Sequence, residues 1–219
     1  MRKATNGISF DDVHSFDDLS LILSEKDIPP ATPKTTYIDV PGADGSLDLT
    51  EASGDVRFQD RSCKFTFTML PSDRTEFEEK KTEISNLLNG KKCKITLDID
   101  SDYYYQGRCT VDDYLQDINL KQIVVTAKVK PYKYKQDVTA VSVQLGQTAK
   151  TIYLDNGRLA VVPQIDCSND NTVVVFNGAT YNLSKGTHKL LDIQLKQGIN
   201  TLTVSGTGTV TFKYQEGDL

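Results

Sequence analysis

Three carboxylates at alternate positions, Asp98, Asp100 and Asp102, are the best acidic candidate in the sequence for a chemical site. Carboxylates spaced by two residues can converge on Ca²⁺ or Mg²⁺ where the backbone turns. A calcium loop of the EF-hand type would need glycine at its sixth position and glutamate at its twelfth, but the sequence has Tyr103 and Cys109 there. We therefore interpret the cluster as the exposed face of a strand that runs into a turn, and predict neither a metal nor a cofactor.

The two histidines of the sequence, His14 and His188, have no nucleophile motif beside them. The G-x-S-x-G, P-loop, G-x-G-x-x-G and H-E-x-x-H patterns are all missing from the sequence, so the usual arrangements for acyl transfer, nucleotide binding and zinc hydrolysis are not indicated. We interpret both histidines as exposed or structural, and we predict that the chain is not an enzyme.

The four cysteines, Cys63, Cys93, Cys109 and Cys167, are separated by 30, 16 and 58 residues. No pair has the C-x-x-C spacing of a zinc or redox site. The N-terminus has no apolar segment of the kind that a secretory signal requires. We expect four free thiols that act as small hydrophobic side chains.

Tyr103, Tyr104 and Tyr105 form the only run of three aromatic residues. Consecutive residues of a strand point to opposite faces of its sheet, so these rings are not expected to form one flat platform for sugars or bases. Tyrosine is enriched at interfaces between proteins. We therefore predict that the run packs in the core or lies at a subunit interface.

The elements that position these residues belong to two expected domains, residues 1–135 and 136–219. Charged side chains are frequent before residue 135 and sparse after it, and Pro131 ends a strand-like run at the junction. The chain has 25 basic and 30 acidic side chains, a net charge of −5, which disfavours a broad basic face for nucleic acid. No apolar run approaches the length of a membrane span, so membrane insertion is not expected.

Alternating apolar residues predict half-buried strands in the first domain at 63–69, 95–99 and 123–129, and a short strand at 37–40. One helix is expected at about 73–89, with Asp73 as its cap and Asn89-Gly90 as its stop. The loop at 41–45 is rich in turn formers. Its Gly42 and Gly45 are expected to have positive φ, and Asp44 to hold the turn by local hydrogen bonds.

The second domain is predicted to be a β-sandwich, because many short strands and turns follow one another. Asn177-Gly178 indicates a hairpin between 172–176 and 179–183. A second hairpin is expected between 199–204 and 209–214, around the loop at 205–208. Further strands are expected at 141–145, 152–154, 160–162 and 190–195.

The order of these segments resembles one family. Residues 36–49 look like the V-P-G-x-D-G-x-L-D signature of siphophage distal tail proteins. The later segments also match in order: Arg57-Phe58, the strand at 63–69, a helix ending at 86–90, the aromatic run in 102–108, Lys130-Pro131-Tyr132, the proline-containing segment 160–165, residues 198–202 and the ending 212–214.

This resemblance implies a mainly β protein with one helix and a C-terminal galectin-like sandwich. The implied function is that of a virion structural protein, a homo-hexameric hub at the distal end of a long non-contractile tail. In that family the N-terminal domains close into a ring that joins the tail tube to the tip, and the sandwiches carry or adjoin the receptor-binding machinery. Its implied partners are further copies of itself, the tail tube protein, a tail-tip or tail-associated protein and a receptor-binding protein. DNA would pass through the channel without specific binding, and assembly would occur in the cytoplasm of the host bacterium.

Two other functions remain open on the residues alone. The sandwich alone would suffice for a carbohydrate-binding module or an adhesin, which would require an exposed aromatic platform. A glycan-processing enzyme would require two of the carboxylates Asp98, Asp100 and Asp102 on either side of a pocket.

Overall fold

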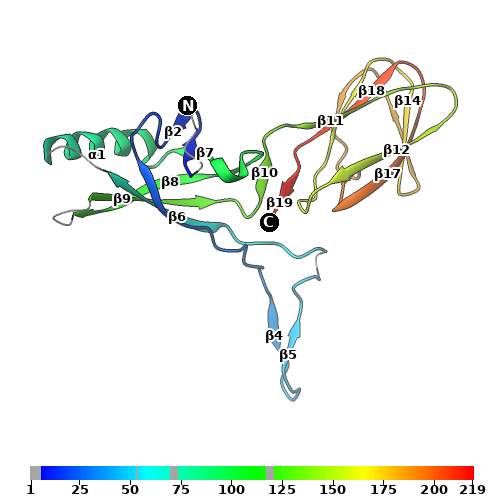
Figure 1. The fold of residues 1–219 in the computed structure, drawn as a ribbon. Helices are drawn as coiled ribbons and strands as arrows, with labels where there is room; N and C mark the ends of the chain where they lie inside the picture. The colour runs from blue at the N-terminus through cyan, green and yellow to red at the C-terminus, as the bar shows by residue number, and fades with distance from the viewer. Residues whose placement is uncertain (1–5, 53, 70–73, 117–120) are drawn as a thin grey trace. The chain divides into compact units, whose positions relative to one another are not determined.

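The computed structural model describes residues 6–52, 54–69, 74–116 and 121–219 (Figure 1). The chain divides into two compact units, unit 1 with residues 1–133 and unit 2 with residues 134–219. Strand β10 (Lys133–Lys135) lies at the division. Each unit has its own cluster of buried apolar side chains. Within the part that is described, no helix is long and apolar enough to cross a membrane.

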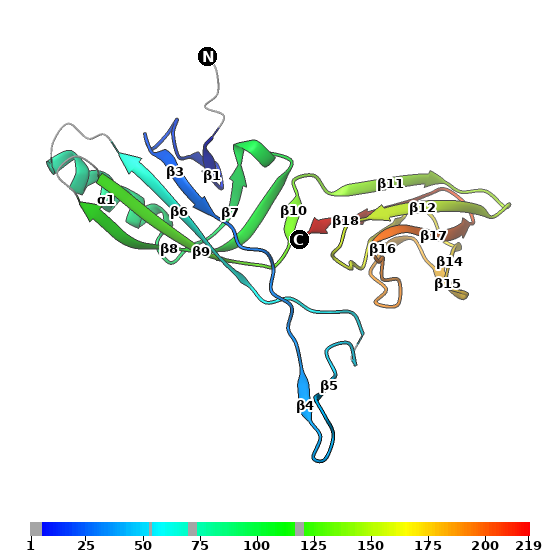
Figure 2. The same cartoon turned by 60° about the horizontal axis from the view of Figure 1, so that its bottom comes forward.

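Unit 1 is built on one antiparallel sheet in which seven strands follow the order β2-β1-β7-β8-β9-β6-β3 (Figure 2). The strands are β1 (Ile8–Phe10), β2 (Val13–His14), β3 (Ile22–Asp27), β6 (Arg61–Met69), β7 (Lys92–Leu97), β8 (Tyr103–Gln116) and β9 (Lys121–Val129). The alternation predicted at 63–69 and 123–129 is confirmed, because Phe65 faces Val125 and Phe67 faces Ile123, all four fully buried.

The sheet of unit 1 curls so that its two ends meet. Phe10 of β1 packs edge-on against Phe65 and Phe67 of β6, with ring centroids 6.5 and 6.2 Å apart. Three other strands stand between β1 and β6 in the sheet order. A flat sheet would hold these rings far apart, since neighbouring strands are spaced by about 4.8 Å. Curvature therefore encloses the core of unit 1 between the strands and the helix.

The one α-helix among the described residues, α1 (Arg74–Leu88), follows the predicted helix closely. Its Phe77, Ile84 and Leu88 are buried in the core of unit 1. The helix stops where Gly90 takes a φ of +75°, a conformation that glycine adopts without steric strain. The predicted cap, Asp73, lies outside the described residues.

The segment between β3 and β6 carries a two-stranded hairpin, β4 (Tyr37–Asp39) and β5 (Ser46–Asp48), which we call the arm together with its turn. Both views show it extending away from the curled sheet of unit 1 (Figures 1 and 2). Every residue from 32 to 48 is exposed. The base of the arm is held by a bridge between Pro33 and Phe58.

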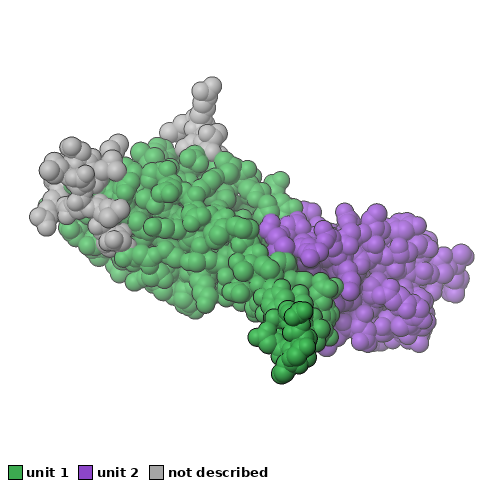
Figure 3. Space-filling model, turned by 90° about the horizontal axis from the view of Figure 1, so that it is seen from below, with its two compact units in different colours: residues 1–133 green, residues 134–219 purple. Residues whose placement is uncertain are grey.

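Unit 2, coloured purple in Figure 3, is a sandwich of two four-stranded antiparallel sheets. The first has the order β11-β18-β13-β16, with β11 (Thr139–Gln144), β13 (Gln164–Cys167), β16 (Gly186–His188) and β18 (Thr209–Tyr214). The second has the order β12-β17-β14-β15, with β12 (Lys150–Asn156), β14 (Thr172–Phe176), β15 (Ala179–Leu183) and β17 (Gly198–Ser205). A last short strand, β19 (Gly217–Asp218), pairs with β10.

The hairpin predicted at Asn177-Gly178 is confirmed, since β14 and β15 pair across it and both turn residues have positive φ. The second predicted hairpin is wrong. β17 pairs with β12 and β14, whereas β18 pairs with β11 and β13. The loop at 205–208 therefore carries the chain from one sheet to the other, and does not join neighbouring strands.

Three further strand predictions need correction. Residues 160–162 and 190–195 form no strands and meet only in one bridge, between Val161 and Leu195. The strand expected at 95–99 ends at Leu97, because the chain then enters a 3₁₀ turn, Asp98–Asp100, that leaves Ile99 exposed.

Candidate assembly surface

The acidic cluster is divided among different partners. Asp98 Oδ2 accepts a hydrogen bond from the Gly7 backbone N–H at 2.9 Å and lies 3.3 Å from His14 Nε2. Asp100 instead forms an ion pair of 2.7 Å with Lys133. Among the described residues, no group of three or more histidine, cysteine or acidic side chains could hold a metal ion. These carboxylates therefore tie loops of unit 1 together.

His188 also has a local structural contact. Its ring Nε2 lies 2.8 Å from the backbone oxygen of Ser184, at the start of the turn that leads into β16. His14 lies 3.3 Å from the carboxylates of Asp17 and Asp98 and is opposite Ser9 in the pairing of β1 with β2, and His188 meets a backbone oxygen.

Each of the three tyrosines at the start of β8 lies beside a cation. The Nζ of Lys133 lies 4.3 Å from the ring centre of Tyr103, and the Nζ of Lys94 lies 4.6 Å from that of Tyr104. Tyr105 belongs to the buried core of unit 1. Tyr104 is also almost fully buried, whereas Tyr103 is half-buried. Only Tyr103 therefore has a substantial surface left for another molecule.

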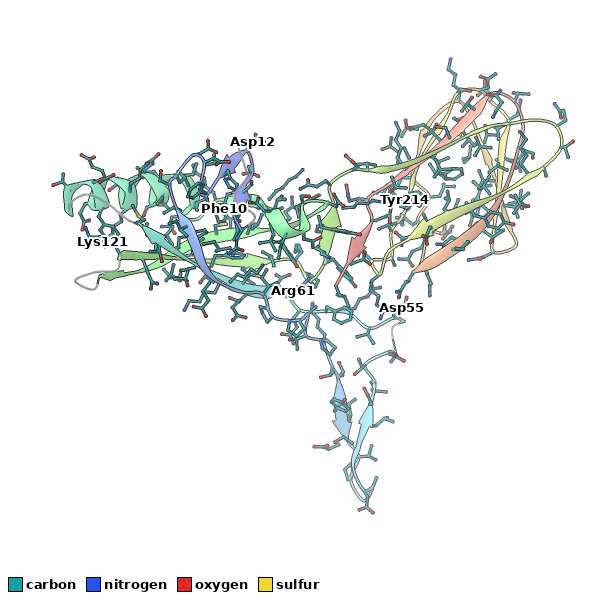
Figure 4. All side chains as sticks on the ribbon, viewed as in Figure 1. Phe10, Asp12, Asp55, Arg61, Lys121 and Tyr214 are labelled. Carbon is teal, nitrogen blue, oxygen red and sulfur yellow. The ribbon has the colours of Figure 1, made fainter. Side chains whose placement is uncertain are left out.

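Tyr105 is stacked against a buried arginine. The guanidinium of Arg61 lies 5.2 Å from the ring centre of Tyr105, and it donates hydrogen bonds to the backbone oxygens of Pro29 and Pro131 (Figure 4). Burial raises the pKa of the Tyr105 phenol, and the nearby Arg61 charge opposes that rise. Arg61, at the start of β6, thus holds the backbone at Pro29, before the arm, and at Pro131, just after β9.

The arm presents apolar side chains to solvent on both of its faces. Ile38 and Leu47 are directly opposite each other in the hairpin, and they are 48% and 53% exposed. Tyr37, on the other face, is 59% exposed. A two-stranded hairpin is marginally stable in water by itself. Exposed apolar residues on such an element indicate that it is completed by contact with another surface.

The turn of the arm contains the three residues singled out in the sequence. Gly42 and Gly45 have φ of +84° and +74°, and no atom lies within 4 Å of the place where a Cβ would stand on either. Asp44 is exposed at the tip. The glycines therefore serve the backbone conformation of the turn, because no close approach of another segment requires them.

A second accessible surface lies at the edge of the curled sheet. β3 is the last strand in the order, and within the described parts of the chain it pairs with β6 alone. It has an irregular register between Leu23 and Glu25, and five of its six residues are exposed, including Ile22. An unpaired strand edge is a natural site for pairing with another chain. No strand was predicted at these residues from the sequence pattern.

The exposure of the arm was also missed, although its signal is visible in the sequence. Tyr37-Ile38 are adjacent apolar residues, so a strand there places one on each face. The segment on either side, from Pro29 to Phe58, is rich in proline, glycine, threonine and acidic residues. Such a composition offers no second layer to cover a strand on both faces.

The described structure defines a mainly β protein, in which a curled antiparallel sheet with one helix is followed by a two-sheet sandwich. A solved structure with this fold is that of Dit (gp 19.1) of phage SPP1, described as a paradigm of the hub adsorption apparatus in phages that infect Gram-positive bacteria. The match has a TM-score of 0.71 and 14% sequence identity, and covers 98% of this chain and 99% of that one. No protein-family model matches the sequence. No curated protein matches it either.

Proposed function

We propose that this chain is a distal tail protein, a non-enzymatic hub at the tip of a long non-contractile phage tail. The observation that carries the proposal is the agreement of fold with SPP1 Dit over almost the whole of both chains. The order of the sequence segments resembles the same family, and its V-P-G-x-D-G-x-L-D segment falls on the turn and second strand of the arm.

The hub is a closed ring of six copies, formed by the N-terminal units. A ring requires head-to-tail contacts, in which each subunit uses two different surfaces. Unit 1 offers two such surfaces, the arm with its exposed Ile38 and Leu47 and the free edge of β3. The half-buried ring of Tyr103 is a third candidate contact. Tyr104 and Tyr105 contribute by fixing the strand from within.

The ring joins the tail tube protein on one side and tail-tip and receptor-binding proteins on the other. The net charge of −5 suits a channel through which DNA moves without binding. The sandwich of unit 2, poor in charged residues, is suited to contacts with the neighbouring tip proteins. The assembly is completed in the host cytoplasm and remains at the virion tail tip.

Light scattering on the full chain, over a range of concentrations, tests the ring. We expect a species of six times the 24.3 kDa chain mass. The double variant Ile38→Glu/Leu47→Glu is expected to give monomers or open fragments, because it places charges in the proposed contact. Leu191→Glu is the matched control, since Leu191 is 79% exposed but lies in unit 2. A full chain that stays monomeric at every concentration, or an arm variant that still forms hexamers, contradicts this assignment of the ring contact.

A further inference from the structure

Two of the four cysteines, 16 residues apart in the sequence, are in direct contact in the structure. The Sγ atoms of Cys93 on β7 and Cys109 on β8 are 2.9 Å apart. Both side chains are buried in the core of unit 1. The other two thiols are placed differently: Cys63 lies on β6, opposite Ala127, and Cys167 lies in unit 2.

The strand pairing explains why these sulfurs meet. Cys93 is directly opposite Gly107, and the backbone N–H of Cys109 donates to the oxygen of Lys91 at 2.9 Å. The two cysteines are therefore diagonal neighbours on the same face of the sheet. A disulfide bond has a length of about 2.05 Å, so the sulfurs need to approach by about 0.9 Å.

The contact makes the two thiols chemically unequal. The hydrogen bond from the Cys109 S–H lowers the pKa of Cys93, although burial opposes this shift. The same bond and burial raise the pKa of Cys109. The thiolate is the reactive form of cysteine. Cys93 is also the more accessible of the two thiols, 5% exposed compared with 0% for Cys109, so we assign the first reaction to Cys93. Burial is the largest cause that raises the pKa of Cys63 to about 11, although the charge of Arg61 opposes the shift, and this raised pKa leaves Cys63 less reactive.

We propose that Cys93 and Cys109 form a dithiol–disulfide site that is oxidised by a small peroxide. The Cys93 thiolate attacks one peroxide oxygen, the O–O bond breaks, and a sulfenic acid and hydroxide form. The Cys109 sulfur then attacks the Cys93 sulfur, the S–O bond breaks, and water leaves with the Cys109 proton. Together the two thiols lose two electrons and two protons, and hydrogen peroxide becomes two molecules of water.

The product is a covalent link between β7 and β8 inside the proposed ring-forming unit. In a reducing cytoplasm all four cysteines remain thiols, as the sequence analysis expects. Once the protein meets an oxidant, the pair closes and the two strands can no longer separate. The site therefore gives unit 1 a reduced form during assembly and a cross-linked form afterwards.

Hydrogen peroxide and the full chain are sufficient for the test. The fully reduced protein is treated with peroxide, quenched, denatured and titrated for free thiols, and its peptides are mapped by mass spectrometry without reduction. We expect the titre to fall from four thiols to two, with one cross-linked peptide that joins Cys93 to Cys109. We also expect the bridge to raise the melting temperature, and a reductant to reverse both changes.

Matched variants separate this site from general oxidation. Cys63→Ala is expected to lose the same two thiols as the parent chain and to form the same cross-linked peptide. Cys109→Ser is expected to form no intramolecular bridge, and its Cys93 is expected to become a sulfenic or higher oxide. Circular dichroism checks that each variant is folded. If the folded parent keeps four thiols, forms Cys93 oxides without a bridge, or links a different pair, the proposal is wrong.

Discussion

Gly107 is a residue of the sheet of unit 1 at which even an alanine side chain would meet backbone atoms. A Cβ added there would lie 2.3 Å from the backbone oxygen of Lys128 and 2.6 Å from Cα of Val129. Both atoms belong to the backbone of the neighbouring chain segment, so side-chain rotation gives no relief. We expect Gly107→Ala to reduce the free energy of unfolding by about 1–3 kcal/mol. Gly146→Ala is the control, because no atom lies within 4 Å of its Cβ position; equal melting temperatures for both variants would contradict this reading.

Because of Tyr214, the stability of unit 2 is expected to depend on pH in the alkaline range. Its hydroxyl donates to the backbone oxygen of Asp155 at 2.5 Å, which ties β18 of one sheet to β12 of the other (Figure 4). Burial raises the pKa of the Tyr214 phenol to about 12, compared with about 10 in an unfolded chain. The folded state therefore favours the protonated phenol, and this contribution to stability is fully present below pH 10 and is lost as the pH rises towards 12.

Replacing Tyr214 by phenylalanine separates that contribution from other titrations. We expect Tyr214→Phe to lower stability by about 1 kcal/mol at neutral pH through the lost hydrogen bond. The difference between parent and variant should then shrink between pH 10 and 12, as followed by denaturant unfolding of both proteins. A difference that stays constant across this range would show that Tyr214 does not titrate as inferred.

At the scale of elements, a substitution in the arm is expected to change the local stability of the arm but not the stability of the whole chain. Gly45→Val places a β-branched residue at a φ of +74°, with a conformational penalty of about 1–2 kcal/mol. Because the arm is exposed throughout, we expect this penalty to appear as faster amide hydrogen exchange in β4 and β5, with little change in the melting temperature of the whole chain. Ala43→Val, at a neighbouring exposed position without positive φ, is expected to leave exchange unchanged. Equal exchange in the two variants would reject the strain argument.

Local patterns in the sequence were sufficient to predict a strand and its buried face where the strand packs one face against the core. Phe65 and Phe67 alternate with Lys64 and Thr66, and the strand and its inward face follow from that pattern. Thr66, expected on the outer face, is nevertheless buried at 7% exposed. The pairing of β17 and β18 could not be predicted in this way, because a short glycine loop suits a hairpin and a change of sheet equally well. The partner of each strand depends on contacts distant in the sequence, such as that of Val210 with Cys167. The same limit explains why the spacing of Cys93 and Cys109 did not reveal their contact.

At the scale of the whole molecule, the two units should be separable. We expect limited proteolysis to cut first between about Pro131 and Val138, where unit 1 ends and unit 2 begins. Fragment mapping by mass spectrometry identifies the site. A first cut within the sheet of either unit would contradict this expectation. The cut would also yield fragments close to residues 1–135 and 136–219.

Of the two fragments, only the N-terminal one is expected to self-associate. Light scattering at high concentration should show oligomers for residues 1–135 and for the full chain, and monomers for residues 136–219, since the arm and the β3 edge both lie in unit 1. The opposite result, with oligomers of the C-terminal fragment and a monomeric N-terminal fragment, would exclude a ring built from unit 1.

The division of the chain into two contiguous segments also has a consequence for synthesis on the ribosome. β6 pairs with β9 along its whole length, and Arg61 faces Val129. Unit 1 therefore cannot complete the pairing of β6 with β9 until the last residues of β9 have emerged. Translation proceeds at about 5–20 residues per second, so unit 1 has several seconds to close while the sandwich is still being made. Strand pairings this distant in sequence form slowly. Because unit 1 is translated first, its pairings begin to form before unit 2 has been synthesised.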